Sequence, residues 1–212
     1  GDNLLVMPNV MLVGYTGLGK TTLANIITNS LGIQPWFLNA SMANGIDTVR
    51  NLENYVKFRS IVNDLTNKVT HKVVILDEFD NFTLEAQKAL RGFIEKYKHN
   101  VRFIATLNYP EKIIKEIRGR FELGTLIYDK IYLDDNNKKD VIKQLVARIE
   151  TILQSEKVEY NVDVILDAIL LYYPDIRSIL SVLQQHYLLK GNLNEKISDI
   201  DIPLIIEMIK RG

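Results

Sequence analysis

The feature that most constrains this chain is the octapeptide GYTGLGKT at residues 14–21. The apolar run NVMLV before it is typical of a buried strand, and KTTLANIITNSL after it predicts a helix that Gly32 closes. The octapeptide fits the spacing G-x-x-x-x-G-K-[ST], in which glycines let backbone amides turn toward phosphate oxygens. A plain glycine turn does not require Gly19, Lys20 and Thr21 in this order. The pattern therefore predicts a phosphate-binding loop between a strand and a helix.

The side chains of this loop indicate a nucleoside triphosphate with Mg²⁺ as its ligand. The Lys20 ammonium adds a positive charge beside the outer phosphates, and the Thr21 hydroxyl can reach the metal ion. The positive end of the helix dipole lies behind the loop. The residues expected to contact nucleotide are consecutive: Gly14, Tyr15, Thr16, Gly17, Leu18, Gly19, Lys20, Thr21 and Thr22.

A second motif, VVILDEFD at residues 73–80, supplies two carboxylates at the end of an apolar run. Asp77 directly ends the run, in the position of a Walker-B carboxylate that holds Mg²⁺, whereas Asp80 comes later. Glu78 follows at once and is suited to orient and polarise an attacking water. The alternative is a solvated acidic turn. The neighbouring phosphate-binding loop favours the metal site.

Four single residues are weaker candidates when each is taken alone. Asn108 ends an apolar run, where its amide can hold a γ-phosphate or the attacking water, although such residues also occur in turns. Arg177 begins a helical pattern and is either a phosphate ligand or a surface ion-pair residue. Arg118 and Arg120 flank Gly119 and are either a solvated helix end or phosphate ligands. We expect the glycine to let the chain leave the helix and aim Arg120 outward.

Strand and helix patterns alternate through the first two-thirds of the chain, which predicts an α/β fold with a mostly parallel five-stranded sheet covered on both faces. The expected strands are 9–14, 35–40, 72–80, 101–108 and 126–133, and the expected helices are 20–31, 47–67, 84–100 and 110–121. Only helical patterns follow, at 139–155, 162–172, 175–189 and 203–210. We therefore expect an α/β nucleotide-type domain at 1–134 and a small all-helical domain at 135–212.

Composition excludes several other classes of protein. The chain has 26 basic and 26 acidic residues, so a nucleic-acid site would have to be a local patch. The absence of cysteine excludes disulfides, thiolate metal sites and cysteine nucleophiles, and the three histidines lack metal-ligand spacing. The apolar runs are shorter than a membrane span. We expect no membrane partner. The expected location is the cytoplasm, the cytosol of the host cell if the protein belongs to a phage, or the nucleus if it belongs to a eukaryote.

Four segments resemble the small subunits of AAA+ clamp loaders, the replication factor C type and its phage relatives. FLNASMANGIDTVRN is similar to the pattern N-A-S-D-x-R-G-I-D-x-V-R-N, and LDEFDNFTLEAQKALRGFIEKY to D-E-x-D…A-Q-x-A-L-R-R-x-I-E-x-Y. RFIATLNYPEKIIKEIRGRFE resembles the sensor-1 strand followed by the S-R-C motif, and YYPDIRSILSVLQ the sensor-2 helix. The resemblance covers most of residues 14–184.

This resemblance implies an AAA+ base and lid that bind and hydrolyse ATP with Mg²⁺. Asn108 falls at sensor 1 and Arg177 at sensor 2. Asn39 falls where AAA+ proteins keep a polar residue that restrains the Walker-B glutamate, here Glu78. Lys20 and Glu78 keep the roles that their motifs predict.

The resemblance also implies partners. Arg120 matches the arginine that enters the ATP site of an adjacent subunit, and Gln87 and Arg91 fall on a helix that couples neighbours. Arg50 falls where the family contacts template-strand phosphates. The expected assembly is a homo- or hetero-oligomeric ring or spiral, a pentamer in a clamp loader, that binds a sliding clamp and primer–template DNA.

The sequence departs from the family pattern at several positions. Gly119 and Phe121 replace the serine and cysteine of S-R-C, Gly92 replaces an arginine, and Met42–Asn44 replace acidic residues and an arginine. The family's N-terminal segment and C-terminal collar domain are not in this sequence, so we expect a fragment or a pared-down relative. Two alternatives stay open: another AAA+ machine such as a helicase loader, and a nucleotide-dependent assembly subunit that does not hydrolyse.

Overall fold

A computed structural model describes residues 7–66, 72–128 and 135–197, with the backbone alone for 58–66, 123, 135 and 136. The chain divides into two compact units, 1–129 and 130–212, and each is described by itself. The predicted domain boundary between residues 134 and 135 stays a prediction, because residues 129–134 lie outside the described residues.

The first unit is built on a five-stranded sheet in which every neighbouring pair of strands is parallel. The strands are β1 (Val10–Val13), β2 (Trp36–Asn39), β3 (Lys72–Asp77), β4 (Val101–Leu107) and β5 (Thr125–Ile127), in the spatial order β2-β3-β4-β1-β5. Because parallel strands point the same way, the ends of β1, β3 and β4 lie at one edge of the sheet. The predicted α/β fold is confirmed.

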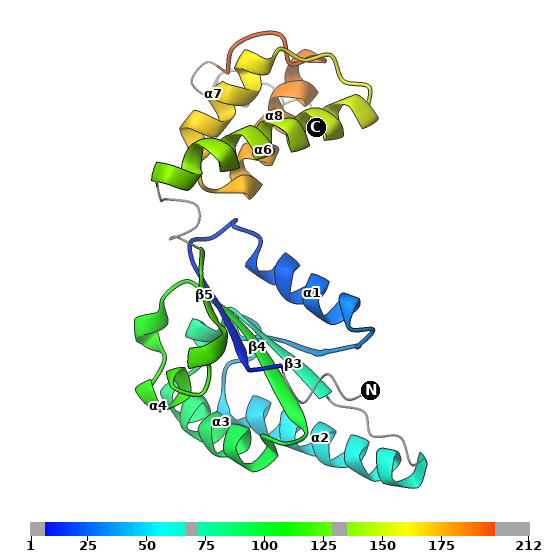
Figure 1. Ribbon diagram of the computed structural model, residues 1–212, viewed down its shortest axis with the longest axis vertical. Helices are drawn as coiled ribbons and strands as arrows, with labels where there is room; N and C mark the ends of the chain where they lie inside the picture. The colour runs from blue at the N-terminus through cyan, green and yellow to red at the C-terminus, as the bar shows by residue number, and fades with distance from the viewer. Residues whose placement is uncertain (1–6, 67–71, 129–134, 198–212) are drawn as a thin grey trace, which may run out of the picture. The chain divides into compact units, whose positions relative to one another are not determined.

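Helices cover both faces of this sheet. Figure 1 shows α1 (Lys20–Ser30) on one face, and α2 (Ile46–Thr66), α3 (Leu84–Tyr97) and the short α4 (Lys115–Arg118) on the other. The apolar core between α2, α3 and the sheet takes alternate residues of the strands. The intervening residues Leu12, Ile75 and Ile104 are also buried. Burial on both faces explains why these strands read as continuous apolar runs.

The helix predicted at residues 110–121 is wrong in its middle. A single 3-10 turn, η3 (Pro110–Lys112), is followed by two residues in extended conformation before α4 begins. Ile113 has φ −91° and ψ 132°, and Ile114 has φ −60° and ψ 143°. The Ile113 side chain is buried in the sheet-side core.

The side chain of Gln87 on α3 stabilises this break. Gln87 is 3% exposed. Its amide nitrogen donates to the carbonyl oxygens of Lys112 at 3.1 Å and Phe82 at 3.2 Å, and its amide oxygen accepts from the Ile114 N–H at 2.9 Å. These bonds replace the helical bonds that the local sequence favours. A contact across 27 residues thus overrides the local helix pattern.

Other boundaries differ by a few residues. Strand β5 begins at Thr125 and covers only the first part of the predicted strand 126–133, whose residues 129–133 lie outside the described residues. Two further 3-10 turns, η2 (Phe79–Asn81) and η4 (Glu122–Gly124), follow β3 and precede β5. The helix predicted at 203–210 also lies outside the described residues.

The second unit is helical, as predicted. It contains α6 (Asp135–Ser155), α7 (Val162–Tyr172) and α8 (Ile176–Lys190). Helix α6 begins four residues before the predicted start at Lys139, and an acidic first residue is favoured there by the helix dipole. Apolar residues of all three helices, together with Leu193, form one core. No helix among the described residues has the length and apolarity needed to cross a bilayer.

We predict that Gln87→Leu destabilises the first unit. The substitution leaves the part-buried Ile114 N–H and Lys112 carbonyl without their side-chain partner, which costs about 1–3 kcal/mol in free energy of unfolding. Denaturant titration measures the change. Lys88→Leu, at an exposed position on the same helix, is the matched control. A Gln87→Leu protein as stable as wild type would contradict the bridging role.

Candidate nucleotide-binding site

The predicted phosphate-binding loop connects β1 to α1 and uses glycine for its backbone conformation. Gly17 has φ 75° and Gly19 has φ 80°, a left-handed conformation that other residues adopt at a cost. A Cβ atom at Gly19 would meet nothing within 4 Å. The backbone angle, rather than lack of space, therefore requires glycine there. Leu18 is buried and anchors the loop between them.

Helix α1 begins directly after this loop and has no side-chain cap at its N-terminus. Its first turn also carries no acidic residue. The first amides of a helix lack intrahelical acceptors and attract anions. The start of α1 therefore offers its amides, together with the helix dipole, to a phosphate group.

Lys20, the first residue of α1, folds back over the loop. It is 9% exposed, and its ammonium donates to the carbonyl oxygens of Gly14 at 2.8 Å and Tyr15 at 2.5 Å. A buried ammonium needs such acceptors. The charge is thus held beside the backbone that the motif assigns to phosphate binding.

The carboxylate of Asp77 joins four elements of the unit. Asp77 ends β3 and is 6% exposed. Its Oδ1 accepts from the Thr21 hydroxyl of α1 and from the Thr106 hydroxyl of β4, each at 2.7 Å. Its Oδ2 accepts from the Asn39 amide at the end of β2 at 3.3 Å. The predicted metal ligands Thr21 and Asp77 are therefore in direct contact.

The donor set around Asp77 fits Mg²⁺. Mg²⁺ prefers oxygen ligands and usually takes one or two from the protein, with waters and substrate phosphates completing its octahedron. Thr21 and Asp77 supply a hydroxyl and a carboxylate beside the phosphate-binding loop. In the part of the chain that the structure describes, no group of three or more His, Cys, Asp or Glu forms a metal cage. The arrangement suits a metal ion that arrives with a nucleotide.

Thr106 is a site residue that the sequence reasoning missed. A β-branched residue inside VRFIATLN reads as an ordinary strand residue. Its hydroxyl nevertheless donates to Asp77 and accepts from the Glu78 N–H at 3.1 Å. One polar side chain in an apolar run, two residues before Asn108, is the signal that was available.

Glu78 is restrained by different residues from the one predicted. It adopts a left-handed backbone conformation with φ 53°, and its Oε2 accepts from Asn81 at 3.3 Å and from the Ser41 hydroxyl. Asn39, expected to hold Glu78, donates to Asp77 instead. Asn39 is linked to the Glu78 side chain through Ser41, whose N–H donates to Asn39 Oδ1 at 2.8 Å.

Asn108 lies beside the phosphate-binding loop. The Gly14 N–H donates to the carbonyl oxygen of Leu107 at 3.2 Å, which places the ends of β1 and β4 side by side. The buried carboxylate of Asp80 accepts from the N–H groups of Asn108 at 3.4 Å and Tyr109 at 3.1 Å. Asp80 therefore orients the backbone that carries the predicted sensor.

The three arginines predicted as candidate phosphate ligands differ in their surroundings. Arg120 forms an ion pair with Glu95 at 2.6 Å, whereas exposed Arg118 has no ion pair with a described residue. Gly119 has φ −60° and ψ −23°, so the expectation that its glycine freedom aims Arg120 is wrong: any residue adopts this helical conformation. Arg177 lies in the first turn of α8 in the second unit, and the structure does not place it relative to the loop.

Three further residues predicted to contact neighbours or DNA lie on α2 and α3. Arg50 is exposed and pairs with Asp47 at 2.7 Å in the first turn of α2. Arg91 is exposed on α3, whereas Gln87 is buried within its own chain and bridges its own backbone. Thr83 caps α3 by accepting from the Ala86 N–H at 3.2 Å.

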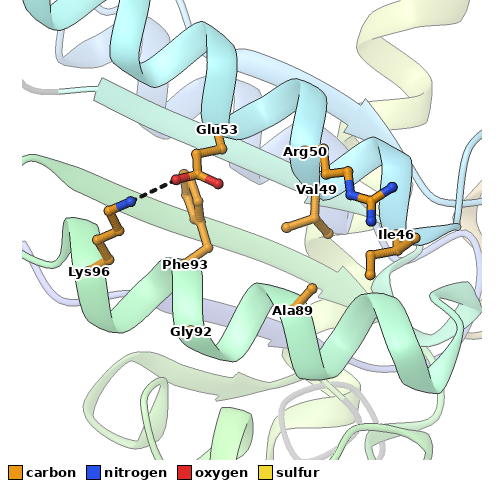
Figure 2. Close-up of a pocket in the computed structure, with 8 residues that line it drawn as sticks. All are labelled: Ile46, Val49, Arg50, Glu53, Ala89, Gly92, Phe93 and Lys96. Carbon is orange, nitrogen blue, oxygen red and sulfur yellow. Dashed lines mark hydrogen bonds and ion pairs between the residues drawn. The ribbon is translucent and has the colours of Figure 1, made fainter.

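A groove of about 300 Å³ lies between α2 and α3 (Figure 2), and its lining residues include none of the phosphate-binding loop. Its floor includes Val49 and Phe93, and the Lys96 ammonium is bound to Glu53 at 2.8 Å. Hydrogen bonds from Lys96 and then Lys57 lower the pKa of the Glu53 carboxyl. The charged side chains that line the groove are already paired, Arg50 with Asp47 and Glu53 with Lys96.

A phosphate-binding loop, a contacting hydroxyl–carboxylate pair and a polar residue at the end of the next parallel strand define a P-loop nucleoside triphosphatase domain. The chain belongs to the ATPase family associated with various cellular activities (AAA), whose family model matches residues 10–127. The predicted class of protein is confirmed.

Similar proteins agree with the finer resemblance. Replication factor C small subunits from Methanothermobacter thermautotrophicus and Sulfolobus acidocaldarius are 31% and 36% identical, over 92% and 84% of this chain and 56% and 52% of their own length. Replication factor C subunit 4 of Saccharomyces cerevisiae is 32% identical over 95% of this chain and 61% of its own. The predicted resemblance to clamp-loader small subunits is confirmed, and the chain spans little more than half the length of these relatives.

The fold of the chain also matches solved structures. The Holliday junction branch migration motor RuvB of Thermotoga maritima aligns with a TM-score of 0.65 at 18% identity, over 97% of this chain and 62% of RuvB. At this identity the likeness shows a shared fold and carries no statement about function.

Proposed function

We propose that this chain is the ATP-binding and hydrolysing module of a sliding-clamp loader subunit that acts in DNA replication. The observation that carries the proposal is the bonding of Asp77 to Thr21, Thr106 and Asn39. It gathers the ends of three strands and the start of α1 around one carboxylate. Similarity to replication factor C small subunits over most of the chain supports the clamp-loader assignment over a helicase loader.

The base of the module supplies the nucleotide contacts. The loop amides and Lys20 bind the phosphates, and Thr21 with Asp77 would hold Mg²⁺. When bound, the metal ion neutralises charge on the phosphate oxygens. Asn108 faces the terminal phosphate or the attacking water, oriented through the bonds from its backbone to Asp80. Arg177, on α8, is the further predicted nucleotide ligand.

Glu78 orients and polarises the attacking water. In this structure its carboxylate accepts from Ser41 and Asn81, so the glutamate has to exchange these bonds for a water before it can act. Asn39 takes part through its bond to Ser41, beside its bond to Asp77. These hydrogen bonds are the route by which a change near residue 41 reaches the catalytic carboxylate.

The assembled protein is a ring or spiral of AAA+ subunits, with five subunits in the clamp-loader form. Arg120 enters the ATP site of one neighbour, and Arg91 lies on the helix that faces a neighbour. ATP binding brings the subunits around primer–template DNA with the sliding clamp held open, and hydrolysis releases both. The remaining alternative is an assembly subunit that binds nucleotide without hydrolysing it. Measured ATP turnover would exclude this alternative, and a lack of turnover would support it.

We predict that each ATP site uses Glu78 of the subunit that binds the ATP and Arg120 of the neighbouring subunit. Arg120→Ala should bind ATP and hydrolyse it poorly, because arginine fingers contribute on the order of 10³–10⁵ in rate in GTPases. Glu78→Gln should bind ATP with little turnover. Mixed assemblies should regain part of the ATPase rate, since one variant keeps a sound site and the other a sound arginine.

The control for this mixing experiment is Arg118→Ala, which should hydrolyse ATP at the wild-type rate. Native mass spectrometry establishes that the two variants assemble together. If co-assembled mixtures regain no activity, Arg120 does not act on a neighbour. A Glu78→Gln variant with wild-type turnover would assign water activation to another residue.

We predict that Arg50 contacts DNA phosphate. In the complete assembly, Arg50→Ala should weaken binding to primer–template DNA of any sequence and reduce the salt dependence by about one phosphate contact. Lys57→Ala, two turns further along α2, is the matched control. Fluorescence anisotropy across a range of salt concentrations measures both. A loss that depends on DNA sequence would contradict backbone contact.

A further inference from the structure

The guanidinium of Arg120 is bound on two sides within its own chain. Its Nε and Nη2 donate to Glu95 Oε2 on α3 at 3.1 and 2.6 Å. Its Nη1 donates to the backbone carbonyl of Glu116 on α4. The Arg120 side chain is 30% exposed, and that of Glu95 is 58% exposed. An exposed arginine would otherwise sample many rotamers, so these contacts select one of them.

The backbone at Arg120 is also fixed. Phe121 is fully buried in the core, and Ile117 is buried three residues before Arg120. The Arg120 carbonyl accepts from the side chain of Asn9 at 3.2 Å, and Asn9 Oδ1 accepts from the Phe103 N–H at 3.1 Å. The start of the side chain is thus held against the sheet, and only the guanidinium reaches the surface.

The contacts within the chain use only some of the N–H donors of the Arg120 guanidinium. Arginine has five N–H donors in one plane. Glu95 takes one from Nε and one from Nη2, and Glu116 takes one from Nη1. One N–H on each Nη therefore has no acceptor among the described residues. Two donors at the outer end of a guanidinium match two oxygens of a phosphate.

We propose that Glu95 is a positioning residue that holds Arg120 through its Nε–Nη2 edge and leaves the outer donors free for the phosphate of a neighbouring subunit. Glu95 acts before assembly, by keeping one rotamer, and stays bound when the phosphate arrives. The inference rests on the proposed role of Arg120 in a neighbour's ATP site.

The charges around Glu95 suit this role. The hydrogen bond from Arg120 is the main cause that holds the pKa of Glu95 below its ordinary value, and Lys98 and Arg91 act in the same direction. The carboxyl therefore stays ionised at neutral pH and is lost as a partner only on acidification. Glu95→Gln keeps an oxygen acceptor without the charge, which makes it the conservative variant.

The test compares ATP turnover by assemblies of the full-length protein with its partner subunits. Glu95→Ala should lower kcat about two- to fivefold, the range expected for loss of one exposed ion pair, with KM for ATP unchanged. Glu95→Gln should recover part of the loss. Glu85→Ala, an exposed acid on the same helix, should match wild type. Sedimentation establishes that each variant assembles.

A double variant separates positioning from a general structural effect. If Glu95 acts only through Arg120, then Glu95→Ala adds nothing to Arg120→Ala. An equal further loss in the double variant would overturn the proposal, as would a wild-type kcat or a faster rate in Glu95→Ala alone. A faster rate would mean that Glu95 competes with the phosphate. If Arg120→Ala itself keeps the wild-type rate, the proposed role of Arg120 fails, which is a distinct outcome.

Discussion

The buried carboxylate of Asp77 is the point at which the sheet and the site depend on each other. It accepts hydrogen bonds from side chains on β2, β4 and α1. A carboxylate that is 6% exposed is costly unless such donors surround it, so the strand ends have to converge for the chain to fold. The same convergence brings Thr21, Asp77 and the phosphate-binding loop together. The hydrogen bonds that bring the strand ends together in the folded chain are therefore the same ones that form the site.

A second set of hydrogen bonds links this carboxylate to a surface loop. Asn39 contacts both Asp77 and the backbone of Ser41, and Ser41 contacts Glu78. The loop after Ser41 contains Met42, which is 89% exposed, and leads to the start of α2. The loop is therefore linked to the glutamate through the Ser41 hydroxyl. This is a physical path from the loop before α2 to Glu78, the hydrolytic residue in our proposal.

Much of this could be predicted from the sequence, because the main signals are local. The phosphate-binding loop is set by eight consecutive residues, and Asp77 by its place at the end of an apolar run. What depends on contacts between distant residues could not be predicted. The break at Ile113 depends on Gln87 in another helix, and the orientation of Arg120 depends on Glu95, 25 residues away.

The central claim is that the Asp77 cluster is a Mg²⁺–ATP site. Calorimetric titration of ATP, with and without Mg²⁺, tests it most directly in the wild type, Asp77→Asn and Lys20→Ala. The account predicts that Asp77→Asn keeps the metal-free affinity and loses the gain that Mg²⁺ provides. Lys20→Ala should bind weakly in both conditions, because a charge beside the phosphates is lost. If Asp77→Asn keeps the full gain in affinity with Mg²⁺, the cluster is not the metal site.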